Sequence, residues 1–188
     1  MCIRDRTQTI NNLFGAKATA PGTGVLLDNT MALFDPHPGH PASVAPGKRV
    51  TSSMAPTMVF RDGRPRWALG LPGGVRIFTS VLQAVVNLID HRMTLQEAVE
   101  APRIWSQGQE LEMEEGITRE IRDAVAARGH RVVPVRAVAG GMNAIAFEAD
   151  GTLTGAACWR ADGMPIGVSG GLARPGIRFR PDVTTPRA

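Results

Sequence analysis

Two adjacent glycines stand between an apolar run and a helical pattern in the stretch LPGGVRI, residues 71–77. The backbone N–H groups of such a turn bind anions, because they point outward beside the positive end of a helix. Three anions are conceivable at Gly73 and Gly74: a phosphate, a substrate carboxylate, or an oxyanion that exists only during a reaction. Phosphate is disfavoured, since Gly70–Gly74 lacks both the Lys-Ser/Thr pair of a P-loop and the glycine spacing of a dinucleotide fingerprint. A purely structural tight turn remains the alternative.

Short polar side chains that suit a small polar ligand occur at two other places. Ser52 and Ser53 come just before an expected strand, where their hydroxyls either donate to a carboxylate or simply begin the strand. Thr9 and Asn11 are two residues apart in the motif TQTIN, so a strand would place both on one face. Neither pair identifies a site by itself.

Two other motifs resemble catalytic or metal sites but lack the necessary context. Ser169 lies in GVSGG, which matches a G-x-S-x-G nucleophile elbow, yet no strand pattern precedes it and no helix pattern follows. His37 and His40 lie in HPGHP without further metal ligands nearby in the sequence. A glycine-rich loop and two loop histidines are the favoured interpretations, and neither a metal nor a cofactor is expected.

The charge distribution argues against a nucleic-acid partner. The 188 residues carry a formal net charge of +4, but residues 1–6 contribute +1 and residues 172–188 contribute +3, which leaves residues 7–171 neutral. A nucleic-acid-binding domain would need a basic face on its folded part. The two cysteines, Cys2 and Cys158, form no disulfide framework, and no apolar run is long enough for a membrane span. We expect one domain over residues 7–171, preceded by an unrelated leader and followed by a basic, flexible tail.

Three helices are predicted from the spacing of apolar residues and from capping residues. The first follows Gly74 and runs to about Asp90, with a broad apolar stripe that predicts deep burial. The second covers residues 94–101 and begins with a capping box, and the third covers residues 118–129.

The strands are predicted to pair mainly as antiparallel hairpins. Asp62-Gly63 separates two strand patterns at residues 56–60 and 66–71, and Asp150-Gly151 separates another two at residues 143–149 and 152–159. A further buried strand is expected over residues 23–29, and residues 35–48 form a proline-rich loop. Strands followed by helices and then by strands predict a layered α/β fold with antiparallel sheets.

Taken in order, these motifs closely resemble the small, C-terminal subunit of γ-glutamyltranspeptidases. The resemblance covers residues 7 to about 165 and rests on TQTINNLFG, GVLLDNTMALF, PGKRVTSSMAPTMVFRDG, LGLPGGVRIFTSVLQAVVNLID, MTLQEAVEAPR, LEMEEG and GMNAIAFEADGTLTGA. It implies an N-terminal-nucleophile (Ntn) hydrolase, a four-layer αββα sandwich that is incomplete here. It also implies a precursor that cleaves itself, a large subunit as partner, and a periplasmic or secreted location.

The resemblance assigns a role to each polar group singled out above. It implies that the N–H groups of Gly73 and Gly74 form an oxyanion hole, and that Ser52 and Ser53 hold the α-carboxylate of a γ-glutamyl substrate. Thr9 would hydrogen-bond near the nucleophile, and Asn11 would contact the amino-acid end of the substrate. A threonine whose own terminal amine is the base needs no separate His or Asp partner, in agreement with the lack of a convincing triad.

Two departures from the family pattern shape the expected activity. The nucleophilic threonine belongs upstream of TQTINN, where MCIRDR stands, so the chain alone is expected to be inactive. Leu33 stands where the family carries an aspartate that binds the α-amino group, and a leucine cannot pair with an ammonium. A γ-glutamyl donor such as glutathione is the first expectation, and a glutaryl-type amidase of the same superfamily is the alternative. A non-catalytic anion-binding module stays open as a third possibility.

Overall fold

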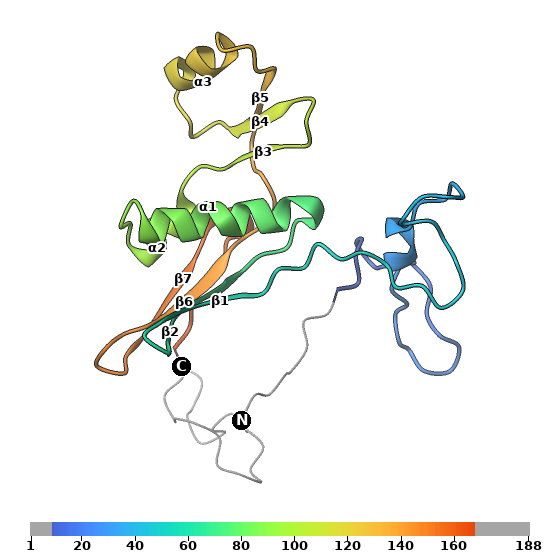
Figure 1. Ribbon diagram of the computed structural model, residues 1–188. Coiled ribbons are helices and arrows are strands. Elements are labelled where there is room, and N and C mark those ends of the chain that lie inside the picture. The colour runs from blue at the N-terminus through green and yellow to red at the C-terminus, as the bar shows by residue number, and fades with distance from the viewer. Residues whose placement is uncertain (1–8, 168–188) are drawn as a thin grey trace.

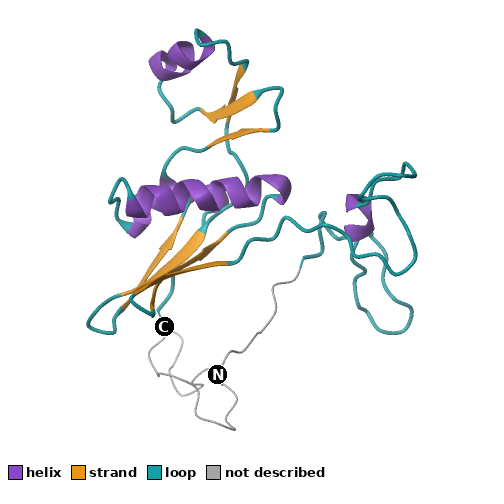
Figure 2. Cartoon of the chain, in the orientation of Figure 1, coloured by secondary structure: helices purple, strands orange, loops and turns teal. Residues whose placement is uncertain are grey.

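The computed structural model describes residues 9–167, which build two small sheets, three α-helices and a large cluster of loops (Figures 1 and 2). The expected leader, Ser169 and the basic tail therefore lie outside the described residues. None of the helices in the described part has the length and apolar character needed to cross a membrane.

A four-stranded antiparallel sheet forms the centre of the molecule. Its strands lie in the order β1 (Thr57–Arg61), β2 (Arg64–Gly70), β6 (Asn143–Phe147) and β7 (Leu153–Ala157). Both predicted hairpins are confirmed, and the β1–β2 turn has positive φ at Asp62 and Gly63, as a two-residue hairpin turn requires.

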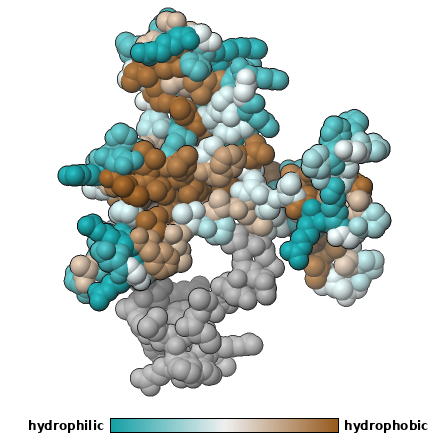
Figure 3. All heavy atoms as spheres, in the orientation of Figure 1, coloured by the Kyte–Doolittle hydropathy of each residue, from teal (hydrophilic) through white to brown (hydrophobic). Residues whose placement is uncertain are grey.

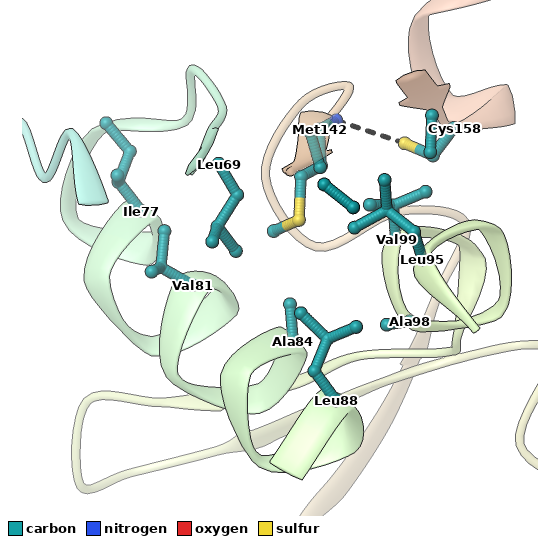
Figure 4. Close-up of a cluster of buried hydrophobic side chains, with 13 residues drawn as sticks. Leu69, Ile77, Val81, Ala84, Leu88, Leu95, Ala98, Val99, Met142 and Cys158 are labelled. Carbon is teal, nitrogen blue, oxygen red and sulfur yellow. Dashed lines mark hydrogen bonds between the residues drawn. The ribbon is translucent and has the colours of Figure 1, made fainter. Parts of the chain in front are cut away.

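Two helices cover one face of this sheet. They are α1 (Ile77–Ile89) and α2 (Leu95–Glu100), and both lie close to their predicted positions. The predicted capping box at the start of α2 is confirmed, because Thr94 and Glu97 bond to each other's backbone N–H groups. The helices and the sheet enclose the core shown in Figure 4, which contains Leu69, Ile77, Val81, Ala84, Leu88, Leu95, Ala98, Val99, Met142 and Cys158.

The predicted deep burial of the first helix is only partly correct. Ile77, Val81 and Leu88 are buried, but Leu82 and Ile89 are 60% and 50% exposed. The apolar stripe of α1 is wider than the surface that the sheet can cover, so its outer edge faces solvent in this chain. Figure 3 shows this edge as apolar surface over the helices.

A second sheet of three short strands stands at the far side of α1. It contains β3 (Ile104–Ser106), β4 (Leu111–Glu114) and β5 (Val132–Val135), and β4 pairs with β5 in parallel through the crossover helix α3 (Arg119–Ala126). The sequence did not predict these strands, because three or four residues are too few to show a period of two.

The third predicted helix, α3, is confirmed in position but not in its packing. Thr118 is its N-cap residue, yet its side chain accepts no capping hydrogen bond, and none of the helix residues is buried. Ile121, one of the apolar residues at helical spacing that predict this helix, is 52% exposed.

The segment before β1 is a loop cluster rather than part of a sheet. The buried strand predicted at residues 23–29 is wrong, because this segment makes one isolated bridge, Thr19 to Leu26, and Val25 is 58% exposed. Residues 25–27 exchange three backbone hydrogen bonds with residues 16–20, but this pairing is too short to form a ladder and does not join either sheet. One short 3-10 helix, η1 (Thr30–Leu33), follows, and the proline-rich loop at residues 35–48 is confirmed as irregular chain.

Candidate active site

The residues to which the family resemblance assigns roles line one cavity of about 440 Å³, whereas His37 and His40 do not. It lies between the loop cluster and the start of α1. Its lining includes all six expected site residues together with Leu33: Thr9, Asn11, Leu33, Ser52, Ser53, Gly73 and Gly74. Four segments that are far apart in the sequence therefore line one cavity.

The glycine turn lines this cavity and carries two N–H groups. Gly73 and Gly74 have φ values of +152° and +60°, which L-residues with side chains rarely adopt. Within the described residues, neither amide N–H donates a hydrogen bond. The turn leads into a short 3-10 helix, η2 (Gly74–Arg76), and then into α1, so the positive end of that helix adds to the attraction for an anion.

The serine pair lies in the loop that enters β1, not in the strand itself, since β1 begins at Thr57. The Ser52 hydroxyl oxygen accepts a hydrogen bond from the N–H of Met54 at 3.2 Å, which leaves its proton available for donation. Ser53 is half-buried beside it and makes no hydrogen bond through its hydroxyl within the described part of the chain. Two hydroxyl donors thus face the same cavity as the glycine turn.

Thr9 and Asn11 do not share the face of a strand, so that expectation is wrong. Asn11 has a φ of +71°, and its N–H donates to the Thr9 hydroxyl oxygen at 2.9 Å, which closes a tight turn. Asn29, which the sequence did not single out, holds this turn: its carbonyl accepts from the Asn11 side chain at 3.4 Å, and its side chain accepts from the Asn12 N–H at 3.0 Å. Both predicted residues still line the cavity.

None of the described residues that line the cavity carries a charge. Its remaining lining is largely apolar: Met54, Ala55, Pro56, Leu69, Gly70, Leu71, Pro72 and Ile77. A carboxylate there would meet hydroxyl and amide dipoles, whereas an ammonium would meet no carboxylate. Leu33, at the end of η1, occupies the position where the amino-group-binding aspartate was expected.

Arg76 lies two residues after Gly74, and its charged side chain contacts the second sheet. Its guanidinium donates to both carboxylate oxygens of Glu112, at 2.9 and 2.6 Å, and lies 4.0 Å from the centroid of the Trp105 ring. The hydrogen bonds that Arg76 donates to Glu112 raise the pKa of Arg76 above its ordinary value. The spacing of these residues gave no signal in the sequence, because the contact joins segments 36 residues apart.

Comparison with known proteins decides the family. The model of the gamma-glutamyltranspeptidase family matches residues 6–168 of this chain. The chain belongs to the γ-glutamyltranspeptidase family. The gamma-glutamyltranspeptidase of Pseudomonas nitroreducens, solved with L-DON, superposes with a TM-score of 0.78 at 31% identity, over 87% of this chain and 92% of that chain. The layered Ntn-hydrolase fold class and the family resemblance are both confirmed.

Two curated relatives of this γ-glutamyltranspeptidase family member bear different names. The acylase ACY 1 proenzyme of Pseudomonas sp. strain V22 is 65% identical over 92% of this chain and 31% of its own length. The glutathione hydrolase proenzyme of Bacillus subtilis strain 168 is 35% identical over 87% of this chain and 28% of its own length. The chain therefore spans about a third of the length of the curated relatives that it matches.

Proposed function

We propose that this chain supplies the oxyanion-binding and carboxylate-binding part of an Ntn enzyme that hydrolyses or transfers the acyl group of γ-glutamyl amides such as glutathione. The observation that carries the proposal is the shared cavity: Ser52 and Ser53 line it together with Gly73 and Gly74, whose N–H groups have no partner among the described residues. An oxyanion and a carboxylate each find suitable donors there.

In this proposal each group has one task. A threonine nucleophile of the complete proenzyme, activated by its own amine, attacks the substrate carbonyl, and Gly73 and Gly74 stabilise the negative oxygen of the tetrahedral intermediate. Ser52 and Ser53 hold the distal carboxylate and thereby fix the distance to the reacting carbon. Thr9 lies near the nucleophile, and Asn11 orients the amino-acid end of the substrate.

A second candidate, a glutaryl-type amidase, is favoured by Leu33. A γ-glutamyl group carries an α-ammonium, and burying it without a partner costs roughly several kcal/mol. The lining residues offer it no carboxylate, whereas a glutaryl chain would pack its methylenes against Leu33. The high identity with proteins named as acylases supports the same candidate.

We further propose that the large subunit of the same precursor covers the open face of the four-stranded sheet. Within residues 9–167 this face carries a second cavity of about 880 Å³, and Met58, Ile145 and Leu153 are 53%, 43% and 62% exposed on it. Side chains alternate along the strands, so these residues point away from α1 and α2. The family resemblance supports export of the mature enzyme to the periplasm or the medium.

The experiment is an assay of the complete proenzyme on γ-glutamyl and glutaryl anilides side by side. Turnover of γ-glutamyl anilide supports the first proposal, and turnover of glutaryl anilide alone selects the second. The variant Ser53→Ala should raise KM for the accepted anilide about tenfold or more, since a charge-assisted hydrogen bond is worth about 1.5–3 kcal/mol. Thr51→Ala, a matched control outside the cavity lining, should leave KM unchanged. Absence of turnover of both anilides would refute both candidates and leave the anion-binding module.

A further inference from the structure

The loop Val138–Gly140 lies directly behind the glycine turn. The N–H of Gly140 donates to the carbonyl oxygen of Pro72 at 2.8 Å. A Cβ atom on Gly73 would lie 2.5 Å from the Cβ of Ala139, and one on Gly140 would lie 2.7 Å from the Pro72 ring. The two segments are therefore in close contact, with no room for a side chain at Gly73 or Gly140.

The bond to Pro72 fixes the direction of the Gly73 amide. The Pro72 carbonyl and the Gly73 N–H belong to one trans peptide plane, so they point in opposite directions. When Gly140 holds the carbonyl on one side, the N–H must point to the other side. The loop thus controls where one of the two anion-binding donors is aimed.

The loop is itself held by a buried group of charges. Arg103 and Glu114 are 2% and 1% exposed. The Arg103 Nη1 donates to the carbonyl oxygens of Val138 and Gly140 at 3.2 and 3.0 Å, and a Glu114 carboxylate oxygen accepts from the Val138 N–H at 2.7 Å. Every contact of these two charges with the loop is to its backbone.

Further contacts hold Arg103 and Glu114 in place. Glu114 accepts from the backbone N–H of Arg103 at 2.9 Å and forms an ion pair with Arg160, whose Nε donates at 2.7 Å. The Arg103 Nη2 donates to the Val99 carbonyl oxygen at 3.2 Å. Such a buried network has one favourable arrangement, because any unpaired member would be costly.

We infer that Arg103 and Glu114 are positioning residues for the oxyanion turn, which they hold from behind through the backbone of Val138–Gly140. The inference rests on the proposed function in that the turn stabilises a reacting oxygen. Two charged side chains that do not line the cavity thus determine the direction of the Gly73 N–H.

The test uses three variants of the complete proenzyme. Arg103→Lys keeps the charge but replaces a planar fork, which reaches three carbonyls, with one ammonium. Gly140→Ala leaves the charges intact and places a Cβ 3.0 Å from the Pro72 carbonyl oxygen. Arg66→Lys is the matched control, because Arg66 also bonds a backbone carbonyl and a glutamate, Phe147 and Glu148, outside the cavity lining.

For each variant, kcat and KM are measured per mole of cleaved protein. Complete loss of one oxyanion donor costs about 100-fold to 1000-fold in kcat, so a misaimed donor should cost about tenfold or more. We expect that loss in kcat for Arg103→Lys and Gly140→Ala, with KM within about threefold of the wild type, because only the transition state uses the donor. Arg66→Lys should retain wild-type kcat. Wild-type kcat in Gly140→Ala would overturn the inference, and this variant decides if Arg103→Lys fails to fold.

A second measurement does not depend on activity. In protein labelled with 15N-glycine, the amide resonances of Gly73 and Gly74 should shift in Arg103→Lys and Gly140→Ala but not in Arg66→Lys. Unshifted resonances would overturn the positioning role even where the wild type is active. If the wild type turns over neither anilide, the proposed function fails, while the resonances still support or overturn the positioning role.

Discussion

The guanidinium of Arg76 binds Glu112 through two hydrogen bonds and stacks on Trp105 at the same time. This contact joins the residue just before α1 to β4 and β3, so it ties the start of the helix to the second sheet. Because a cation at a helix N-terminus is unfavourable, the carboxylate of Glu112 compensates for the position of Arg76.

This pair should couple more strongly than a surface ion pair. A double-mutant cycle with Arg76→Lys and Glu112→Gln should give a coupling free energy of about 1 kcal/mol or more, since the pair is bidentate and half-buried. The exposed pair Arg119–Asp123 on α3 is the control and should give about 0.5 kcal/mol or less. Denaturant unfolding of the complete protein measures both cycles, and equal couplings would contradict the prediction.

The N–H of Gly74 should contribute to the reaction and little to substrate binding. Replacing Gly74 with proline would force φ from +60° to about −65° and change the whole turn. A backbone ester at Gly74 removes the N–H alone. It should lower kcat by about 100-fold to 1000-fold, or about 2.7–4 kcal/mol, with little change in KM. Steady-state kinetics of the ester-containing proenzyme tests this, and an unchanged kcat would exclude Gly74 from the oxyanion hole.

Leu33 should set the choice between the two acyl groups. Leu33→Asp places a carboxylate at the cavity and should raise the ratio of kcat/KM for γ-glutamyl over glutaryl anilide by about tenfold or more, since a charged hydrogen bond is worth about 1.5–3 kcal/mol. Met31→Asp adds the same charge to η1 outside the cavity lining and should leave the ratio unchanged. The same shift in both variants would show a general charge effect instead.

The capping box of α2 should make stability depend on pH in acid. Hydrogen bonds from the side chain and the backbone of Thr94 hold the pKa of Glu97 below its usual value of 4.5. A carboxyl with a depressed folded-state pKa stabilises the fold above its unfolded pKa and loses that contribution as the pH falls through the folded pKa. We therefore expect the wild type to have a higher Tm than Glu97→Gln at pH 7, with the gap closing below pH 4.5.

Repeating this comparison in a Thr94→Ala background provides the control for Glu97. Without the Thr94 hydroxyl, the Glu97 carboxylate loses its main partner. The difference in Tm that Glu97→Gln causes at pH 7 should therefore be smaller in this background. A gap that stays constant from pH 7 to acid would mean that the charge of Glu97 does not stabilise the cap.

Local signals in the sequence predicted the hairpins, α1, α2 and the glycine turn, because each depends on a few adjacent residues. Asp62-Gly63 fixes a turn, Thr94 and Glu97 fix a helix start, and Gly73-Gly74 permits a backbone that other residues avoid. The family resemblance predicted that Ser52 and Ser53 belong to the same site as the glycine turn, and both serines line its cavity. No rule based on sequence spacing could have predicted this.

The features that the sequence did not predict correctly depend on contacts between residues that are far apart in the chain. The strand expected at residues 23–29 has an apolar pattern, but it pairs only briefly with residues 16–20 and joins neither sheet. The Arg103–Glu114 contact with residues 138–140 joins segments 24 to 37 residues apart, and no period reveals such a contact. Long-range pairing, whether of strands or of charges, is what the sequence alone could not specify.

The loop cluster before β1 has a consequence for how the cavity opens. Thr9, Asn11 and Leu33 line one side of it, yet their segment shares no strand ladder with the four-stranded sheet whose strand β2 leads into the glycine turn. Local opening needs little free energy where few backbone groups are paired and few apolar side chains are buried. That side can therefore detach while β2 and β6 stay folded, so amide exchange in residues 9–33 should run far ahead of exchange in the sheet.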